Sequence, residues 1–266
     1  MRRLRDVMTP TSRLRYLAWR AFGVPETLTV RLIAGPRIFL RREPAREPVD
    51  DAGVAREVFV EEPYRSPRPL DRSSVKRVVD VGANVGYSIL YFLREYPQAT
   101  IDAFEPHPLH CAQIESHLRV NCDSQRVHLH PVAVGSKAGC SKLSDAGVGS
   151  HLVSSSAAGL TVKVVNFFAW AGASEIDLLK LDCEGAEYDL VMDERFRTLR
   201  AKTIVLEWHA TESHPEAERD ILTRLESLGF EVVPISRANN EVLRRHFGLH
   251  AVGVAWAYRP EEGRCE

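Results

Sequence analysis

The order of apolar segments after Lys76 is the feature that most constrains the fold. Short apolar runs alternate there with helical stretches, which is typical of βα units on a parallel sheet. The pattern predicts strands over Arg77–Val81, Thr100–Phe104, Val127–Val134, Asp177–Leu181, Thr203–Glu207, Glu231–Ile235 and Ala251–Tyr258. It predicts helices over Gly86–Tyr96, Leu109–Val120, the stretch after Ala186, and Pro215–Leu228. No long crossover helix fits between the last two strands, so we expect the final strand to be antiparallel.

One stretch inside this α/β pattern has no clear period. Residues 135–165 are small, polar and rich in Gly and Ser, and they predict an irregular excursion or an edge hairpin. A helical turn is expected over Asn166–Gly172.

Residues 1–75 form a separate N-terminal extension to the main domain of residues 76–260. We expect a short amphipathic helix at Leu14–Phe22, a β-hairpin at Leu28–Leu40 and a short helix at Val54–Tyr64. Six arginines and one aspartate among the first 20 residues favour a solvated helix face packed on the main domain. Peripheral contact with an anionic membrane remains an alternative, as does a homodimer contact through this extension.

Composition excludes several classes of protein. Hydrophobic residues make up 44% and charged residues 27%, which is typical of a globular protein. A net charge of -1 argues against a nucleic-acid partner. The five cysteines form no C-x-x-C pair, and the basic N-terminus lacks an apolar signal core. We therefore expect reduced thiols and a cytoplasmic location.

The first candidate site is the turn Asp80-Val81-Gly82-Ala83-Asn84-Val85-Gly86, which joins the first strand to its helix. Glycines there let the backbone approach a ligand, and the helix N-terminus offers free N–H groups. The dinucleotide fingerprint G-x-G-x-x-G is not met, because Asn84 stands at the second glycine position. Taken alone, the turn also fits an ordinary tight connection.

A second candidate follows the next strand. Glu105 ends that strand 19 residues after Gly86, and Pro106 stops it. An acidic residue in this place accepts both hydroxyls of an adenosine ribose in doubly wound folds. The spacing and the strand context favour this role over that of a solvated loop carboxylate.

Polar residues also end the fourth and fifth strands. Asp182 and Glu184 follow one, while Glu207 and His209 end the other on a shared face. Ligands bind at the carboxyl ends of strands in open α/β sheets, so these four side chains are expected near one another. Helix capping remains the structural alternative for Asp182 and Glu184, as does an ordinary structural role for His209.

These segments, VVDVGANVGYS, AFEPHP, IDLLKLDCEGAEYDLV and VLEWH, resemble the FkbM family of S-adenosylmethionine-dependent methyltransferases. The resemblance covers roughly residues 54–258 and keeps the family's motif order. It implies a class I methyltransferase, Rossmann-like sheet of seven strands in the order 3-2-1-4-5-7-6, with strand seven antiparallel. It also implies O-methylation of a sugar, glycoside, glycolipid or natural-product hydroxyl.

The resemblance assigns roles to residues of this chain. The catalytic set comprises His209, Asp182, Glu184 and Glu207. The cofactor-binding set comprises Asp80, Gly82, Ala83, Asn84, Gly86, Glu105, Pro106 and Asp182. A small-molecule or glycan acceptor is expected to contact residues 1–75 and 135–165, with Tyr64, Ser150 and His151 as candidates.

His209 is the first candidate for the general base and Asp182 the second. No metal is required by this interpretation, but Asp182, Glu184, Glu207 and His209 would also suit Mg²⁺. The alternatives are N-methylation on the same fold, a non-catalytic nucleotide-binding Rossmann-like protein, and an NAD-dependent oxidoreductase. The last is disfavoured by the glycine pattern.

Overall fold

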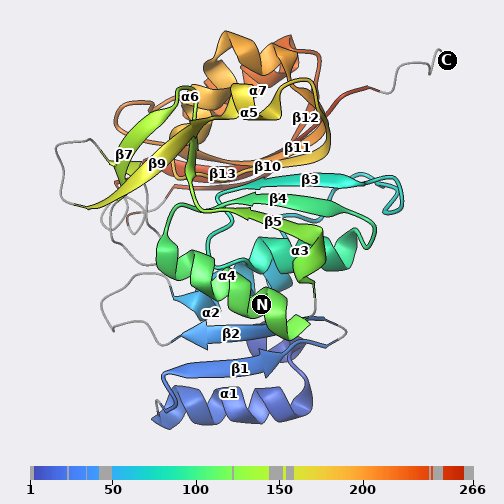
Figure 1. The fold of residues 1–266 in the computed structure, drawn as a ribbon, viewed down its shortest axis with the longest axis vertical. Coiled ribbons are helices and arrows are strands. Elements are labelled where there is room, and N and C mark those ends of the chain that lie inside the picture. The colour runs from blue at the N-terminus through green and yellow to red at the C-terminus, as the bar shows by residue number, and fades with distance from the viewer. Residues whose placement is uncertain are drawn as a thin grey trace.

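The computed structural model describes residues 3–22, 24–33, 35–41, 50–121, 123–143, 152–153, 159–239, 241 and 248–260. A central sheet crosses the middle of the molecule, with helices on both of its faces and the N-terminal extension stacked beyond one helical layer (Figure 1). Within these residues, no helix has the length and apolar character needed to cross a bilayer.

The central sheet has seven strands. They are β3 (Arg77–Val81), β4 (Thr100–Phe104), β5 (Val127–His130), β10 (Glu175–Leu181), β11 (Arg200–Ala210), β12 (Glu231–Ala238) and β13 (Ala251–Tyr258). Their order across the sheet is β12-β13-β11-β10-β3-β4-β5. Numbered along the chain, this is 3-2-1-4-5-7-6, and β13 is antiparallel to both of its neighbours. The predicted fold class is confirmed.

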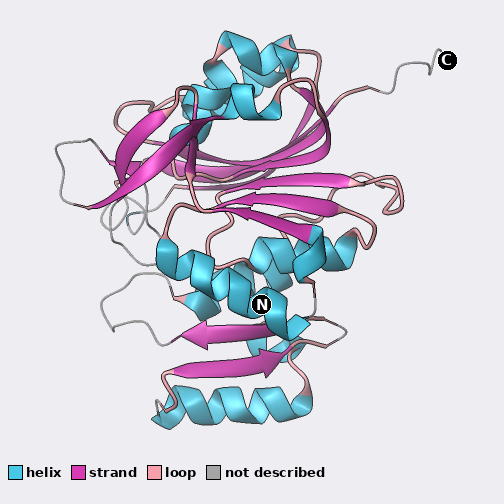
Figure 2. Ribbon diagram, viewed as in Figure 1, coloured by secondary structure: helices cyan, strands magenta, loops and turns pink. Residues whose placement is uncertain are grey.

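Helices cover both faces of the sheet (Figure 2). One layer holds α3 (Tyr87–Glu95) and α4 (Pro108–Asn121), and the other holds α5 (Phe167–Ala171), α6 (Ala186–Met192) and α7 (Ala217–Ser227). Short 3₁₀ turns occur at Ser124–Arg126 and Glu194–Thr198. Two large hydrophobic clusters fill the spaces between the sheet and these layers. Helix α7 ends before Gly229, whose φ of 84° lies in the left-handed region that glycine tolerates.

The predicted third strand, Val127–Val134, is wrong as one element. β5 ends at His130, and after Pro131 the chain enters β6 (Ala133–Gly135) of a second sheet. Proline has no N–H for the ladder, so the strand breaks there. The second sheet also contains β7 (Gly139–Leu143), β8 (Leu152–Val153) and β9 (Leu160–Asn166), in the order β6-β9-β7-β8. The weakly patterned region therefore contains more regular structure than the expected irregular excursion or edge hairpin.

The N-terminal extension contains the predicted helix and hairpin. A 3₁₀ turn (Leu4–Val7) precedes α1 (Pro10–Phe22), which starts earlier than expected because Pro10 suits a first helical position. β1 (Thr27–Arg31) and β2 (Arg37–Arg41) form the antiparallel hairpin. α2 (Asp51–Arg56) then continues into a π-helical turn (Glu57–Glu61), so this helix begins before the expected Val54.

Partly buried hydrogen bonds join the extension to the main domain. The backbone N–H of Phe39 donates to His117 Nε2 at 2.8 Å, and the Tyr87 hydroxyl donates to the Phe39 carbonyl at 2.6 Å. One hydrophobic cluster also runs from Leu4 through Phe59 to Tyr258. The extension is thus packed on the layer of α3 and α4.

Candidate active site

The turn after β3 is shaped by close contact with the chain after β10. Gly82 has φ 82°, and a Cβ atom on it would lie 1.7 Å from the carbonyl oxygen of Asp182. Only glycine fits this crossing. Asn84 also has a positive φ, 50°, and the N–H groups of Gly82 and Ala83 donate to the Phe104 carbonyl. The turn is therefore held at the carboxyl ends of β3 and β4.

Glu105 is held in place by two backbone donors. The Asn84 N–H donates to Oε2 and the His107 N–H to Oε1, both at 2.8 Å. His110 Nδ1 lies 3.3 Å from the same Oε1. The carboxylate faces a cleft that is also lined by Gly82 and Asn84, with apolar walls from Phe104, Pro106, Val132, Ala133 and Val134. Each carboxylate oxygen has capacity for another donor, so this cleft fits a ribose diol beside a flat apolar base.

Lys180 was given no role by the sequence, yet it occupies the centre of the site. Its side chain is 1% exposed, and Nζ lies 3.0 Å from Asp80 Oδ1 and 3.3 Å from Asp182 Oδ2. Nζ also donates to the Gly82 carbonyl at 2.7 Å. Burial by itself lowers the pKa of Lys180, but the two carboxylates outweigh it and keep the pKa above its usual value. A single lysine inside the apolar run of β10 was the available signal.

Asp80 contacts Lys180 and Ser88. It is fully buried, and its Oδ2 accepts from the Ser88 hydroxyl at 2.6 Å. Neither Asp80 nor Gly86 lines the two cavities of the site, whereas Gly82, Asn84 and Asp182 line both. The predicted part of Asp80 and Gly86 in cofactor binding stays a prediction.

A buried carboxylate fixes the orientation of His209. Glu187 Oε1 lies 2.8 Å from His209 Nδ1 and also accepts the His209 N–H at 3.1 Å. The same carboxylate accepts the Gly185 N–H, at 2.8 Å to Oε2. Glu187 is fully buried and His209 is 3% exposed. The imidazole is thereby anchored at Nδ1, and Nε2 is directed toward the cavity residues.

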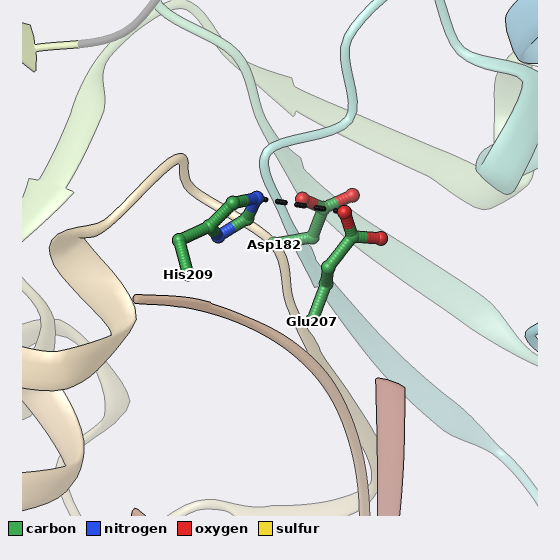
Figure 3. A group of neighbouring side chains, drawn as sticks. All are labelled: Asp182, Glu207 and His209. Atoms are coloured by element: carbon green, nitrogen blue, oxygen red, sulfur yellow. Dashed lines mark ion pairs between the residues drawn. The ribbon is translucent and has the colours of Figure 1, made fainter. Parts of the chain in front are cut away.

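Three further carboxylates surround His209 Nε2. Glu207 Oε1 is 3.5 Å away and Glu184 Oε2 is 3.6 Å away. Asp182, Glu207 and His209 have their ligand-capable atoms within 4.8 Å of one another, and their side chains converge on one point (Figure 3). Burial by itself lowers the pKa of His209, but Glu187 outweighs it and holds the pKa well above its usual value. Desolvation beside like charges raises the pKa of Glu184 to about 7 and also raises that of Glu207.

A cavity of about 280 Å³ opens beside this cluster and is completed by the N-terminal extension. Glu57 and Tyr64 line it from one side, and Lys180, Glu207 and His209 from the other. The Tyr64 hydroxyl donates to Asp182 Oδ2 at 3.3 Å. Desolvation, followed by the charges of Glu207 and Asp182, raises the pKa of Glu57 well above its usual value.

The structure thus brings most of the predicted site residues together. Five of them line the larger cavity: Tyr64, Asp182, Glu184, Glu207 and His209. Ser150 and His151 lie outside the described residues. Sequence reasoning missed Lys180 and Glu57, and it did not pair Glu187 with His209.

A sheet of this strand order, parallel except for its seventh strand, with a glycine turn after its first strand and a buried acid after its second, defines the class I methyltransferases, whose methyl donor is S-adenosylmethionine. Residues 80–232, more than half of the chain, match the family model described as the methyltransferase FkbM domain. The chain belongs to the FkbM methyltransferase family.

Individual relatives agree with this assignment. Methyltransferase sdnD of Sordaria araneosa is 27% identical over 194 residues, covering 58% of this chain and 73% of that protein. Methyltransferase 1 of Beauveria bassiana is 43% identical over 56 residues, which are 21% of each protein.

Solved structures show weaker similarity. The methyltransferase FkbM of Methylobacillus flagellatus has a TM-score of 0.46 and 12% identity, over 72% of this chain and 45% of that one. The precorrin-6y C5,15-methyltransferase of Geobacter metallireducens has a TM-score of 0.47 and 15% identity, over 82% and 94%. The family assignment rests on the match to the family model.

Proposed function

We propose that this methyltransferase is an S-adenosylmethionine-dependent O-methyltransferase that acts on a hydroxyl of a sugar, glycoside, glycolipid or natural product. The observation that carries the proposal is the pair of Glu187 and His209 beside a cavity of about 280 Å³. An alcohol must lose its proton during methyl transfer, so a positioned base distinguishes an O-methyltransferase from an enzyme that methylates a neutral amine.

The two cavities divide the binding tasks. The cleft at Glu105 would hold the adenosine part of S-adenosylmethionine, through hydrogen bonds from the ribose hydroxyls to the carboxylate. Gly82, Ala83 and Asn84 would surround its amino-acid part. When bound, the cofactor supplies an electrophilic sulfonium methyl, and the protein's own task is to align the acceptor and take its proton.

His209 is the base that the geometry favours. Glu187 at Nδ1 fixes the neutral ring as the Nδ1–H tautomer, which leaves the Nε2 lone pair for a proton from the cavity side. Asp182 is the weaker candidate, because Lys180 and Tyr64 already engage its Oδ2. Glu184 and Glu207 would then hold the proton on Nε2 by hydrogen bonding and orient neighbouring acceptor hydroxyls.

The carboxylates of the larger cavity indicate which kind of acceptor it would bind. Glu57, Asp182, Glu184 and Glu207 contribute carboxylates, whereas Lys180 is already paired with Asp80 and Asp182. Carboxylates accept hydrogen bonds from vicinal hydroxyls and repel phosphate or carboxylate groups. We therefore expect a neutral or amine-bearing polyol at the reacting end of the acceptor.

The carboxylates of the larger cavity also raise the alternative that the site binds a metal ion. Asp182, Glu207 and His209 could hold Mg²⁺, with Glu184 nearby. Lys180 already supplies positive charge at Asp182, and His209 would supply it beside Glu207 and Glu184 once it has taken the acceptor's proton. We propose that turnover is independent of a divalent ion, so EDTA should leave it unchanged. Loss of turnover in EDTA and recovery with Mg²⁺ would move the assignment to a metal site.

Measurements of cofactor binding, of methyl transfer and of variant turnover test the proposal. Calorimetric titration should show binding of S-adenosylmethionine and S-adenosylhomocysteine but no binding of NAD. An acceptor screen that begins with neutral glycosides should then show methyl transfer to oxygen. His209→Gln should cut turnover by about 10²–10⁴ with cofactor affinity unchanged. His128→Gln, at an exposed position of β5, is the matched control. Full turnover in His209→Gln would exclude His209 as the base.

A further inference from the structure

Helix α1 presents apolar side chains to solvent on the face that points away from the protein. Leu14 is 71% exposed, Leu17 40% and Phe22 79%. Ala18 and Ala21 are also exposed. At 3.6 residues per turn, Leu14, Leu17, Ala18 and Ala21 fall in one sector of the helix, with Phe22 at its margin. We call these five residues the outer stripe.

The opposite face of α1 is the one that packs on the protein. Trp19 is buried and its Nε1–H donates to the Pro25 carbonyl at 2.7 Å. Ser12 is buried and its hydroxyl accepts the Arg31 N–H at 2.8 Å. α1 also lies at the end of the molecule, beyond the hairpin of β1 and β2 (Figure 1). The outer stripe is therefore not needed to anchor the helix.

Arginines border the outer stripe on both sides. By the same helical geometry, Arg15 lies along one margin, and Arg13 and Arg20 lie along the other. The helix contains no acidic residue. Arg13 and Arg20 reach Asp6 and Asp50 only at 3.8 Å, with side chains 49% and 59% exposed. These guanidinium groups remain accessible to anions outside the protein.

We propose that α1 docks this enzyme onto an anionic membrane surface. An apolar stripe bordered by cationic side chains is the pattern of a helix that lies in the interfacial plane, with leucine and phenylalanine in the acyl boundary and arginine at the headgroup phosphates. A second copy fits less well. Stripe-to-stripe contact would set one arginine margin against another, with no acid on either helix to compensate.

The proposal is tested by co-sedimentation of the full chain with vesicles. Vesicles of phosphatidylcholine with phosphatidylglycerol should bind the protein, less strongly at high salt, and vesicles of phosphatidylcholine alone should bind it poorly. The variant Leu14→Ser, Leu17→Ser, Phe22→Ser should bind about tenfold more weakly or less. Leu109→Ser, at a 64% exposed leucine of α4, should bind like the unchanged protein.

A second triple variant tests the contribution of the arginines, and thermal unfolding tests whether each variant is folded. Arg13→Gln, Arg15→Gln, Arg20→Gln should weaken binding to anionic vesicles and reduce its dependence on salt. Thermal unfolding of each variant checks that the fold persists. Absence of binding by the unchanged protein, or binding by both triple variants that is as tight as that of the unchanged protein, overturns the proposal. Sedimentation velocity that shows a dimer dissolved by the serine variant, without vesicle binding, would instead make the outer stripe a contact between copies.

Discussion

Glu187 and His209 form a fully buried carboxylate–imidazole pair with 2.8 Å between Oε1 and Nδ1. Glu187 belongs to α6 and His209 to β11. Because Glu187 also accepts the Gly185 N–H, its side chain joins the loop after β10 to the neighbouring strand. The pair also explains why His209 has a raised pKa while its Nε2 still faces the cavity.

Glu187→Gln should therefore change both the height and the position of the pH–activity profile. Loss of the carboxylate charge lowers the pKa of His209, so the neutral imidazole forms at lower pH and the rising limb shifts toward acid. Maximal turnover should fall, because the ring loses its strongest orienting partner. Turnover measured across pH under saturating cofactor checks this, and a profile that keeps its midpoint would contradict it.

Glu105→Ala should weaken the binding of S-adenosylhomocysteine by about tenfold to a hundredfold, the cost of losing hydrogen bonds to a charged acceptor. The fold should persist, because Glu105 borders a cleft instead of supporting the core. Calorimetric titration measures the affinity. Glu115→Gln, at an exposed carboxylate of α4, serves as the control, and equal affinity in both variants would remove Glu105 from the cofactor site.

Lys180→Met should destabilise the protein by about 3–5 kcal/mol, the usual cost of leaving a buried charge without its partner. Methionine is similar in length to lysine, but Asp80 loses the ammonium 3.0 Å from its Oδ1. Adding Asp80→Asn to Lys180→Met should recover part of this loss. Urea denaturation of the two variants provides the comparison, and no recovery would show that Asp80 is not the group left unpaired.

His117 should make stability fall in mild acid. Burial lowers its pKa from 6.5 to about 4 in the folded protein, because desolvation of the charged ring outweighs the hydrogen bonds to the Val85 carbonyl and the Phe39 N–H. The unfolded chain binds the proton more tightly, so stability present above pH 6.5 is lost as pH falls through about 4. The full loss is about 3 kcal/mol. Denaturation midpoints across this range should decline less in His117→Gln, and parallel declines would rule the group out.

The sequence predicted the central sheet well because its strands are short, apolar and separated by clear helices. β3, β4 and β13 have the predicted bounds. The third strand failed at Pro131, where an apolar run continues through a residue that cannot stay in the ladder. β11 extends three residues beyond Glu207 because antiparallel pairing with β13 continues to Ala210 and Ala251, a long-range contact that no local pattern reveals.

The candidate site was predictable where its residues follow strands and not where they depend on tertiary contact. Glu105, Asp182 and His209 end strands, so their convergence followed from topology. Lys180 is a lone lysine between leucines of its strand, and only the approach of Asp80 and the turn at Gly82 explains it. Glu57 could not be placed, because nothing in its own segment indicates that the turn Glu57–Glu61 lies beside the larger cavity.

Glu57 and Tyr64 line the larger cavity, but they lie in a different part of the chain from the residues proposed for cofactor binding. The residues proposed for cofactor binding all come after residue 75, whereas one wall of the acceptor cavity is contributed before it. The leading segment can therefore diverge, or be exchanged between homologous enzymes, and retune acceptor preference while the methyl-donor machinery is inherited unchanged.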